Sequence, residues 1–68
     1  MRLADWLKDE KLSYAAAARA FGCSRPACYY YAIGRTIPGA QFTENIRRST
    51  GGQVTADDHH AAYWAVRS

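Results

Sequence analysis

Four side chains of the kinds that ligate zinc are present, namely Cys23, Cys28, His59 and His60. The cysteines have four residues between them, at the upper limit for zinc sites, and the histidines are adjacent, whereas zinc sites separate them by about three to five residues. Helical periodicity also places both thiols on core positions. We therefore expect free, reduced and structural thiols, with no metal and no other cofactor.

The run from Asp57 to His60 contains residue types that serve as general acids and bases. Successive helix residues point in different directions, and no nucleophile has a partner at a useful spacing. We therefore interpret this run as a solvated helix start and the protein as not being an enzyme.

Positive charge is concentrated in the middle of the chain. The formal net charge is +3, but residues 13–50 alone hold five arginines against Glu44, a local net charge of +4. The arginines are Arg19, Arg25, Arg35, Arg47 and Arg48. Because the guanidinium group suits bidentate contacts to phosphate and guanine, this composition indicates a polyanionic partner.

Apolar periodicity and capping residues predict one compact all-α domain over residues 1–68, with a core that must be small at this length. Ser13 and Ser24 are expected to begin helices, and Gly22 and Gly34 to end them. The five helices are expected at about 2–11, 14–21, 25–33, 38–49 and 56–67.

The second and third of these helices form the centre of the predicted fold. Ala18 provides the small side chain that two crossing helices need, and Gly22 tolerates the backbone of the tight turn between them. Cys28 and Tyr31 then point inward. The outward face of the third helix carries Arg25, Pro26, Tyr29 and Tyr30.

Three motifs in this order resemble small Cro/repressor-type regulators with a lambda-repressor-like DNA-binding domain, in particular short prophage-type members. They are Ala18, Gly22, Cys23-Ser24, Cys28 and Tyr31 in helix-turn-helix register, then Gly34-Arg35-x-Ile37-Pro38, then Thr50-Gly51-Gly52-x-Val54-Thr55. The resemblance implies a five-helix domain, usually dimeric, that binds an operator and represses transcription. This chain departs from the pattern in its two cysteines, in Tyr31 and in Pro26.

The resemblance implies that the recognition helix, residues 24–33, enters the major groove of double-stranded DNA. Base readout is assigned to Arg25, Pro26, Tyr29 and Tyr30, and backbone contacts to Ser13, Tyr14, Arg19, Ser24, Arg35, Thr36 and Gln41. Arg25 could bond guanine O6 and N7, or instead contact phosphate or remain solvated. One exposed tyrosine would pack on a thymine methyl or sugar and the other would bond phosphate; alternatively, one is half-buried against Phe21 or Phe42.

The last predicted helix carries an apolar face made of Ala61, Tyr63, Trp64 and Ala65. We expect this face to join two copies into a homodimer that binds a palindromic operator, because one small module offers too few contacts to select a genomic site. The alternative is that Trp64 folds back onto the first helix near Trp6 and Leu7.

We expect a cytoplasmic protein, since the cysteines are unpaired and neither a leader nor an apolar run of about 20 residues is visible. A membrane and a small-molecule substrate are not expected as partners. A second class of function remains open, an antitoxin-like or accessory protein-interaction module on the same helical fold. DNA binding would be distinguished by its steep salt dependence.

Overall fold

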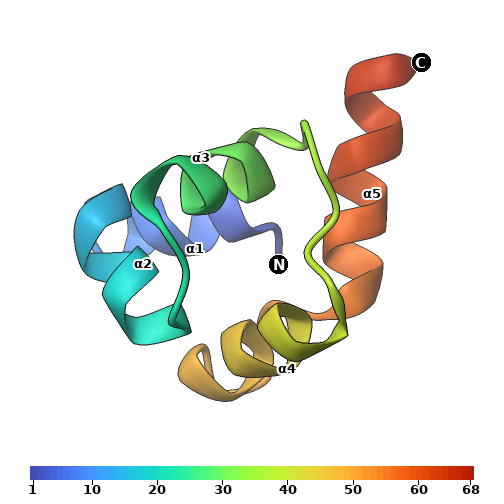
Figure 1. Cartoon of the computed structure of the whole chain (residues 1–68). Helices are drawn as coiled ribbons and strands as arrows, with labels where there is room; N and C mark the ends of the chain where they lie inside the picture. The colour runs from blue at the N-terminus through green and yellow to red at the C-terminus, as the bar shows by residue number, and fades with distance from the viewer.

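The computed structural model describes residues 1–68, which form five helices and no strand (Figure 1). The helices are α1 (Leu3–Asp9), α2 (Tyr14–Phe21), α3 (Arg25–Ile33), α4 (Ala40–Ser49) and α5 (Ala56–Arg67). The predicted all-α class is therefore confirmed. None of the helices combines the length and the apolar character that crossing a bilayer would require.

The bounds of α2 and α3 agree with the prediction because local signals set both ends. The Ser13 hydroxyl oxygen accepts the Ala16 N–H at 3.1 Å, and that of Ser24 accepts the Ala27 N–H at 3.2 Å. Gly22 and Gly34 end these helices in the left-handed conformation, at φ values of 77° and 80°.

The first helix is shorter than the predicted range 2–11. Arg2 is extended and precedes the helix, and Lys11 adopts a positive φ of 55°. The Leu12 N–H then bonds the Leu7 carbonyl at 3.0 Å, which closes the helix end as a glycine normally would. A lysine gives no sequence signal for that conformation.

The fourth helix begins two residues later than the predicted Pro38. Gly39 has an extended backbone and precedes the first helical residue, Ala40. Pro38 is buried outside the helix, where its carbonyl accepts a hydrogen bond from the Thr43 hydroxyl at 3.2 Å. The proline therefore ends the preceding loop and does not start the helix.

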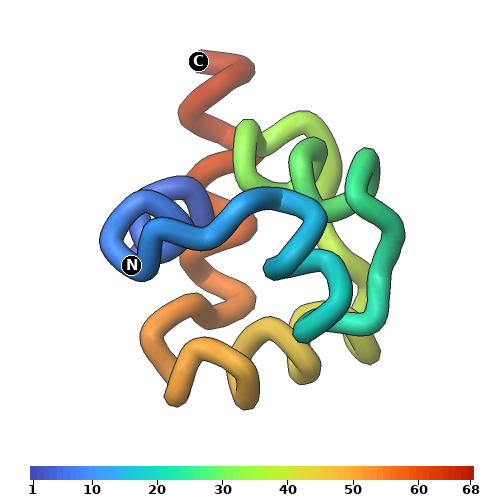
Figure 2. The backbone as a smooth tube through the Cα atoms, turned by 90° about the vertical axis from the view of Figure 1, so that its left-hand side faces the viewer, coloured from blue at the N-terminus to red at the C-terminus, as the bar shows by residue number.

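The core lies where α1, α2 and α3 meet α4 and the segment before α5 (Figure 2). Its fully buried large side chains are Phe21, Cys28, Ile46 and Val54. Trp6 of α1 packs against Phe21 with ring centroids 6.2 Å apart. The helix pair α2–α3, which displays the outward face of α3, thus rests on side chains of α1, of α4 and of the segment before α5.

The start of α5 is fixed by a capping box. The Asp58 carboxylate accepts the Thr55 N–H at 2.9 Å and also pairs with the amino group of Met1 at 3.1 Å. Burial by itself would raise the pKa of Asp58, but these hydrogen bonds and the adjacent ammonium group lower it.

The interpretation of residues 57–60 as a solvated helix start is wrong for His59, whose side chain is only 2% exposed. Burial lowers the pKa of this imidazole, the neighbouring Asp58 charge opposes the shift, and His60 adds to it. The Nε2 atom of His59 has no hydrogen-bond partner, and neither has the buried Nε1 of Trp6. His59 is therefore a neutral core residue.

The C-terminal turns of α5 extend beyond the other helices in both views (Figures 1 and 2). Trp64 lies on these turns and is 64% exposed, so the alternative in which it folds back onto Trp6 and Leu7 is wrong. Ala62, on the opposite side, is buried, and its carbonyl lies 2.5 Å from the position of a Cβ built on Gly34. Only a glycine allows α5 to pack this closely on the chain after α3.

Candidate nucleic-acid interface

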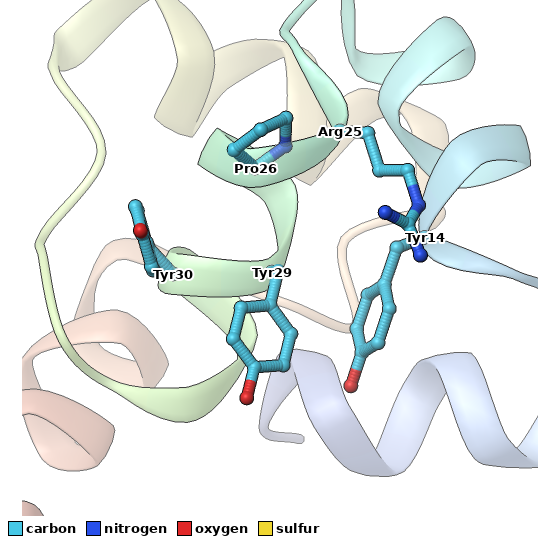
Figure 3. Close-up of a pocket in the computed structure, with 5 residues that line it drawn as sticks. All are labelled: Tyr14, Arg25, Pro26, Tyr29 and Tyr30. Carbon is cyan, nitrogen blue, oxygen red and sulfur yellow. The ribbon is translucent and has the colours of Figure 1, made fainter.

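The first two turns of α3 present four predicted site residues on one open face. Arg25 and Pro26 come from the first turn, and Tyr29 and Tyr30 from the second. Together with Tyr14, from the start of α2, they line a hollow of about 340 Å³ (Figure 3). The structure thus brings together all four side chains that were assigned to base readout and one that was assigned to the DNA backbone.

The tyrosines form a continuous aromatic cluster across this hollow. The rings of Tyr14 and Tyr29 meet edge to face with centroids 5.2 Å apart, and those of Tyr29 and Tyr30 are 5.9 Å apart. Tyr29 is 43% exposed, and Tyr30 is half-buried. Neither of them stacks with Phe21 or Phe42, whose aromatic neighbours are Trp6 and Tyr31. The structure therefore does not support that alternative placement.

Two lysines extend the positive charge beside Arg25, and sequence reasoning missed both of them. Lys8 and Lys11 line a second hollow with Ser13, Tyr14 and Arg25. Arg25 forms no hydrogen bond or ion pair within the chain, so its guanidinium group is available to a ligand. In the sequence, nearby carboxylates offset the charge of these lysines. Their place beside Arg25 follows only from the packing of α1 against α3.

Arg35 adjoins the same face from the other end of α3. Its guanidinium carbon lies 4.8 Å from the centre of the Tyr30 ring, a distance at which cation–π attraction operates. Its carbonyl and that of Gly34 each accept a hydrogen bond from Arg67 at 3.0 Å. The guanidinium group of Arg67 also lies 3.5 Å from the centre of the Tyr63 ring. The segment that carries Arg35 is therefore attached to α5.

The other residues assigned to backbone contacts are more dispersed. The oxygens of Ser13 and Ser24 cap α2 and α3, which leaves each hydroxyl hydrogen free to donate. Arg19 and Thr36 are exposed without a partner, and Gln41 donates to Asn45 on its own helix at 2.9 Å. Neither hollow beside Arg25 is lined by Arg19, Thr36 or Gln41.

The arginines of α4 have hydrogen-bond partners on their own helix. Arg47 holds Glu44 through two hydrogen bonds, of 2.7 and 2.9 Å, and Arg48 donates to Asn45 at 3.0 Å. The hydrogen bond from Arg47 lowers the pKa of Glu44. Of the five central arginines, Arg19, Arg25 and Arg35 are therefore free of a carboxylate partner, and only Arg25 among them lines a hollow beside the α3 face.

The thiols lie beneath this face and not on it. Cys28 is fully buried and Cys23 is partly buried against the core. Burial, with a smaller contribution from Cys23, raises the pKa of Cys28 to about 11. No group of three or more potential ligand side chains is close enough together to hold a metal ion. Both cysteines thus pack as small apolar side chains.

Comparison with profiles of known protein families, with curated proteins and with solved structures finds no match for this chain. A function therefore has to be inferred from the residues themselves.

Proposed function

We propose that this chain is a lambda-repressor-like, Cro-type transcriptional repressor that binds double-stranded DNA by inserting α3 into the major groove. The observation that carries the proposal is the open face formed by Tyr14, Arg25, Pro26, Tyr29 and Tyr30, with an unpaired arginine at the helix N-terminus. In helix-turn-helix proteins the N-terminal residues of the second helix contact base edges. Repression follows when the bound protein excludes polymerase from a promoter, and no catalysis is required.

Each part of this face has a distinct role in the proposal. Arg25 bonds the O6 and N7 atoms of a guanine, and the tyrosines contact thymine methyl, sugar or phosphate groups. The N-termini of α2 and α3, neither of which has an acidic residue in its first turn, face phosphates with Ser13 and Ser24. Arg35, Lys8 and Lys11 add phosphate contacts from both sides of α3.

The proposed working unit is a homodimer that binds a palindromic operator. Ala61, Trp64 and Ala65 are exposed on α5, and Tyr63 packs against Trp64 with ring centroids 5.3 Å apart. The small residues would allow two α5 helices to approach closely, and tryptophan is enriched among the residues that anchor interfaces. Two recognition helices would then read half-sites about one turn, roughly 10–10.5 base pairs, apart.

Selection of bound sites from random duplex DNA tests this proposal. We expect one enriched, imperfectly palindromic sequence, whose affinity falls steeply when salt is raised, because bound counterions are released from the phosphates. For a homodimer in which Arg35, Lys8 and Lys11 of each copy contact phosphates, about six contacts in all, raising salt from about 50 to 200 mM should weaken binding on the order of a thousandfold. Failure to enrich any sequence, or binding that salt does not weaken, would instead favour an antitoxin-like or accessory protein-interaction module.

A further inference from the structure

The geometry points to a specific ligand for the hollow beside Arg25: the C5-methyl group of a pyrimidine that lies within two base pairs of the guanine bound by Arg25. This inference rests on the proposed function, since it concerns which feature of the duplex the α3 face selects. The methyl group would occupy the hollow between Pro26 and the tyrosine rings while the guanidinium group bonds the guanine edge.

The residue types that line the hollow favour guanine and a methyl group over the polar edges of adenine and cytosine. Its five lining residues include no asparagine, glutamine, aspartate or glutamate. The side chains that ordinarily read adenine through its N6 and N7 atoms, or cytosine through its amino group, are therefore missing. One guanidinium group and a largely apolar wall of proline and tyrosine rings remain, with the tyrosine hydroxyls only at the ends of the rings. The first matches guanine, and the second matches the C5-methyl group, the apolar feature that a pyrimidine exposes in the major groove.

The hollow has a defined shape that can accept the edge of one pyrimidine. The edge-to-face contact between Tyr14 and Tyr29 gives the wall a defined form before any ligand arrives. Tyr29 also contacts Tyr30 at a tilted angle, and the guanidinium group of Arg35 lies over the Tyr30 ring, so the cluster is supported from both sides. A volume of about 340 Å³ is ample for the methyl-bearing edge of one pyrimidine. An apolar group that enters a preformed hollow requires little reorganisation of the protein.

The spacing of Arg25 and Tyr29 along α3 limits how far the pyrimidine can lie from the guanine. Arg25 and Tyr29 are one helical turn apart, about 6 Å along the axis at about 1.5 Å per residue. Base pairs are stacked about 3.4 Å apart. The two side chains therefore reach positions within two base-pair steps of one another, which places the methyl-bearing pyrimidine close to the guanine.

The test replaces each thymine of the selected operator, one at a time, by deoxyuridine, which removes only the methyl group. At one position near the critical guanine we expect a loss of about three- to fivefold in affinity, the amount expected for exposing one buried methyl group. At that position, a 5-methylcytosine–guanine pair should also bind more tightly than a cytosine–guanine pair if any C5-methyl group suffices. A preference confined to thymine would assign the hollow to that base alone.

Protein variants assign the effect to the hollow. Tyr29→Ala should reduce the difference between thymine and uracil to less than about 1.5-fold, whereas Tyr29→Phe, which keeps the ring, should retain it. Pro26→Ala removes the proline ring from the wall of the hollow, at an exposed position where alanine suits the helix. It should also reduce the difference in affinity between thymine and uracil operators. Circular dichroism checks that each variant keeps its helices.

The outcomes separate this inference from the function on which it rests. A protein that enriches no duplex refutes both. A protein that binds a selected operator tightly, but tolerates every thymine-to-uracil replacement, refutes the methyl contact and leaves DNA binding intact. The methyl contact is also refuted if the operator has no thymine or methylated cytosine within two base pairs of its critical guanine. It is refuted as well if the methyl effect persists in both Tyr29→Ala and Pro26→Ala.

Discussion

Arg25 and Arg35 lie at opposite ends of α3 and are held in different ways. Arg25 follows the Ser24 cap, borders both hollows of this face and has no partner within the chain. Arg35 is stacked on Tyr30, and its backbone is bonded to Arg67. An unpaired guanidinium group at a helix N-terminus suits a base edge, whereas a cation held beside the helix end suits the phosphate backbone.

We therefore expect the two arginines to affect specificity differently. Arg25→Ala should lose about 1–3 kcal/mol of binding free energy on the selected operator and far less on random DNA, and should relax preference at one base pair. Arg35→Ala should weaken both kinds of binding to a similar extent. Fluorescence anisotropy on both duplexes measures this. The assignment of Arg25 fails if its replacement lowers specific and random binding equally.

His59 links the stability of the fold to pH. Its folded-state pKa lies below the ordinary value of 6.5, so the unfolded chain binds the proton more readily in the interval between the two values. Stability should therefore be complete above about pH 6.5 and fall as the pH drops below it, by up to about 1.4 kcal/mol per pH unit. Asp58, whose pKa is lowered from 3.8, acts only in more acidic solution.

Urea unfolding between about pH 5 and 7.5 tests this coupling. His59→Gln should lower stability but remove most of the pH dependence, because the buried titrating group is gone. His60→Gln, at the exposed neighbouring position, is the matched control. It should keep most of the wild-type slope, because burial and not the charge of His60 is the main cause of the lowered His59 pKa. A wild-type slope that survives in His59→Gln would show that another group causes it.

At the scale of the elements, the contact between the end of α3 and α5 determines how the binding face is supported. Gly34 meets the Ala62 carbonyl, and Arg67 bonds the carbonyls of Gly34 and Arg35 and that of Tyr63, the last at 2.8 Å. Arginine suits this position because its planar fork can serve several acceptors at once. The proposed DNA-binding face of α3 and the proposed dimer helix are therefore parts of one packed unit.

Gly34→Ala should be markedly more destabilising than Gly51→Ala. Both glycines have positive φ, of 80° and 63°, so both substitutions should incur about 1–2 kcal/mol of backbone strain. Only the new Cβ at position 34 would collide with backbone, whereas nothing lies within 4 Å at position 51. We expect a further loss of about 1–3 kcal/mol for Gly34→Ala in urea unfolding. Equal losses would contradict the close packing of α5.

The C-terminal end of α5 carries the two most exposed large apolar side chains of the molecule. Trp64 and Val66 are 64% and 62% exposed on turns that extend beyond the remaining helices. Under the proposed function this chain has a single recognition helix, and two-fold pairing would double its contacts with DNA. The proposed homodimer contact is at this end of the molecule.

Trp64→Ala should leave the helical content nearly unchanged, shift sedimentation to that of a monomer and weaken operator binding by roughly a hundredfold, because the two half-sites are no longer linked. Ile37→Ala removes an exposed apolar side chain outside α5 and serves as the control that should remain dimeric. A dimeric Trp64→Ala protein, or a wild-type protein that binds one half-site as tightly as the full operator, would contradict the proposed contact.

Local chemistry determined much of the fold before any tertiary contact was known. Ser13 and Ser24 satisfy free N–H groups at helix starts, and Gly22 and Gly34 adopt the backbone that ends helices, so the bounds of α2 and α3 follow from neighbouring residues. The outward position of the α3 site residues follows from helical periodicity once Cys28 is placed inside. These signals act over one or two turns and are therefore legible in sequence.

Features that depend on contacts between distant segments follow from tertiary packing and could not be predicted from local sequence. His59 is buried and Trp64 exposed because α5 turns one particular face toward the core, which its weakly patterned sequence does not specify. Lys8 lies beside Arg25 because α1 packs against α3, although the carboxylates of α1 balance its charge along the chain. Position within the fold, and not residue type, brings these groups together.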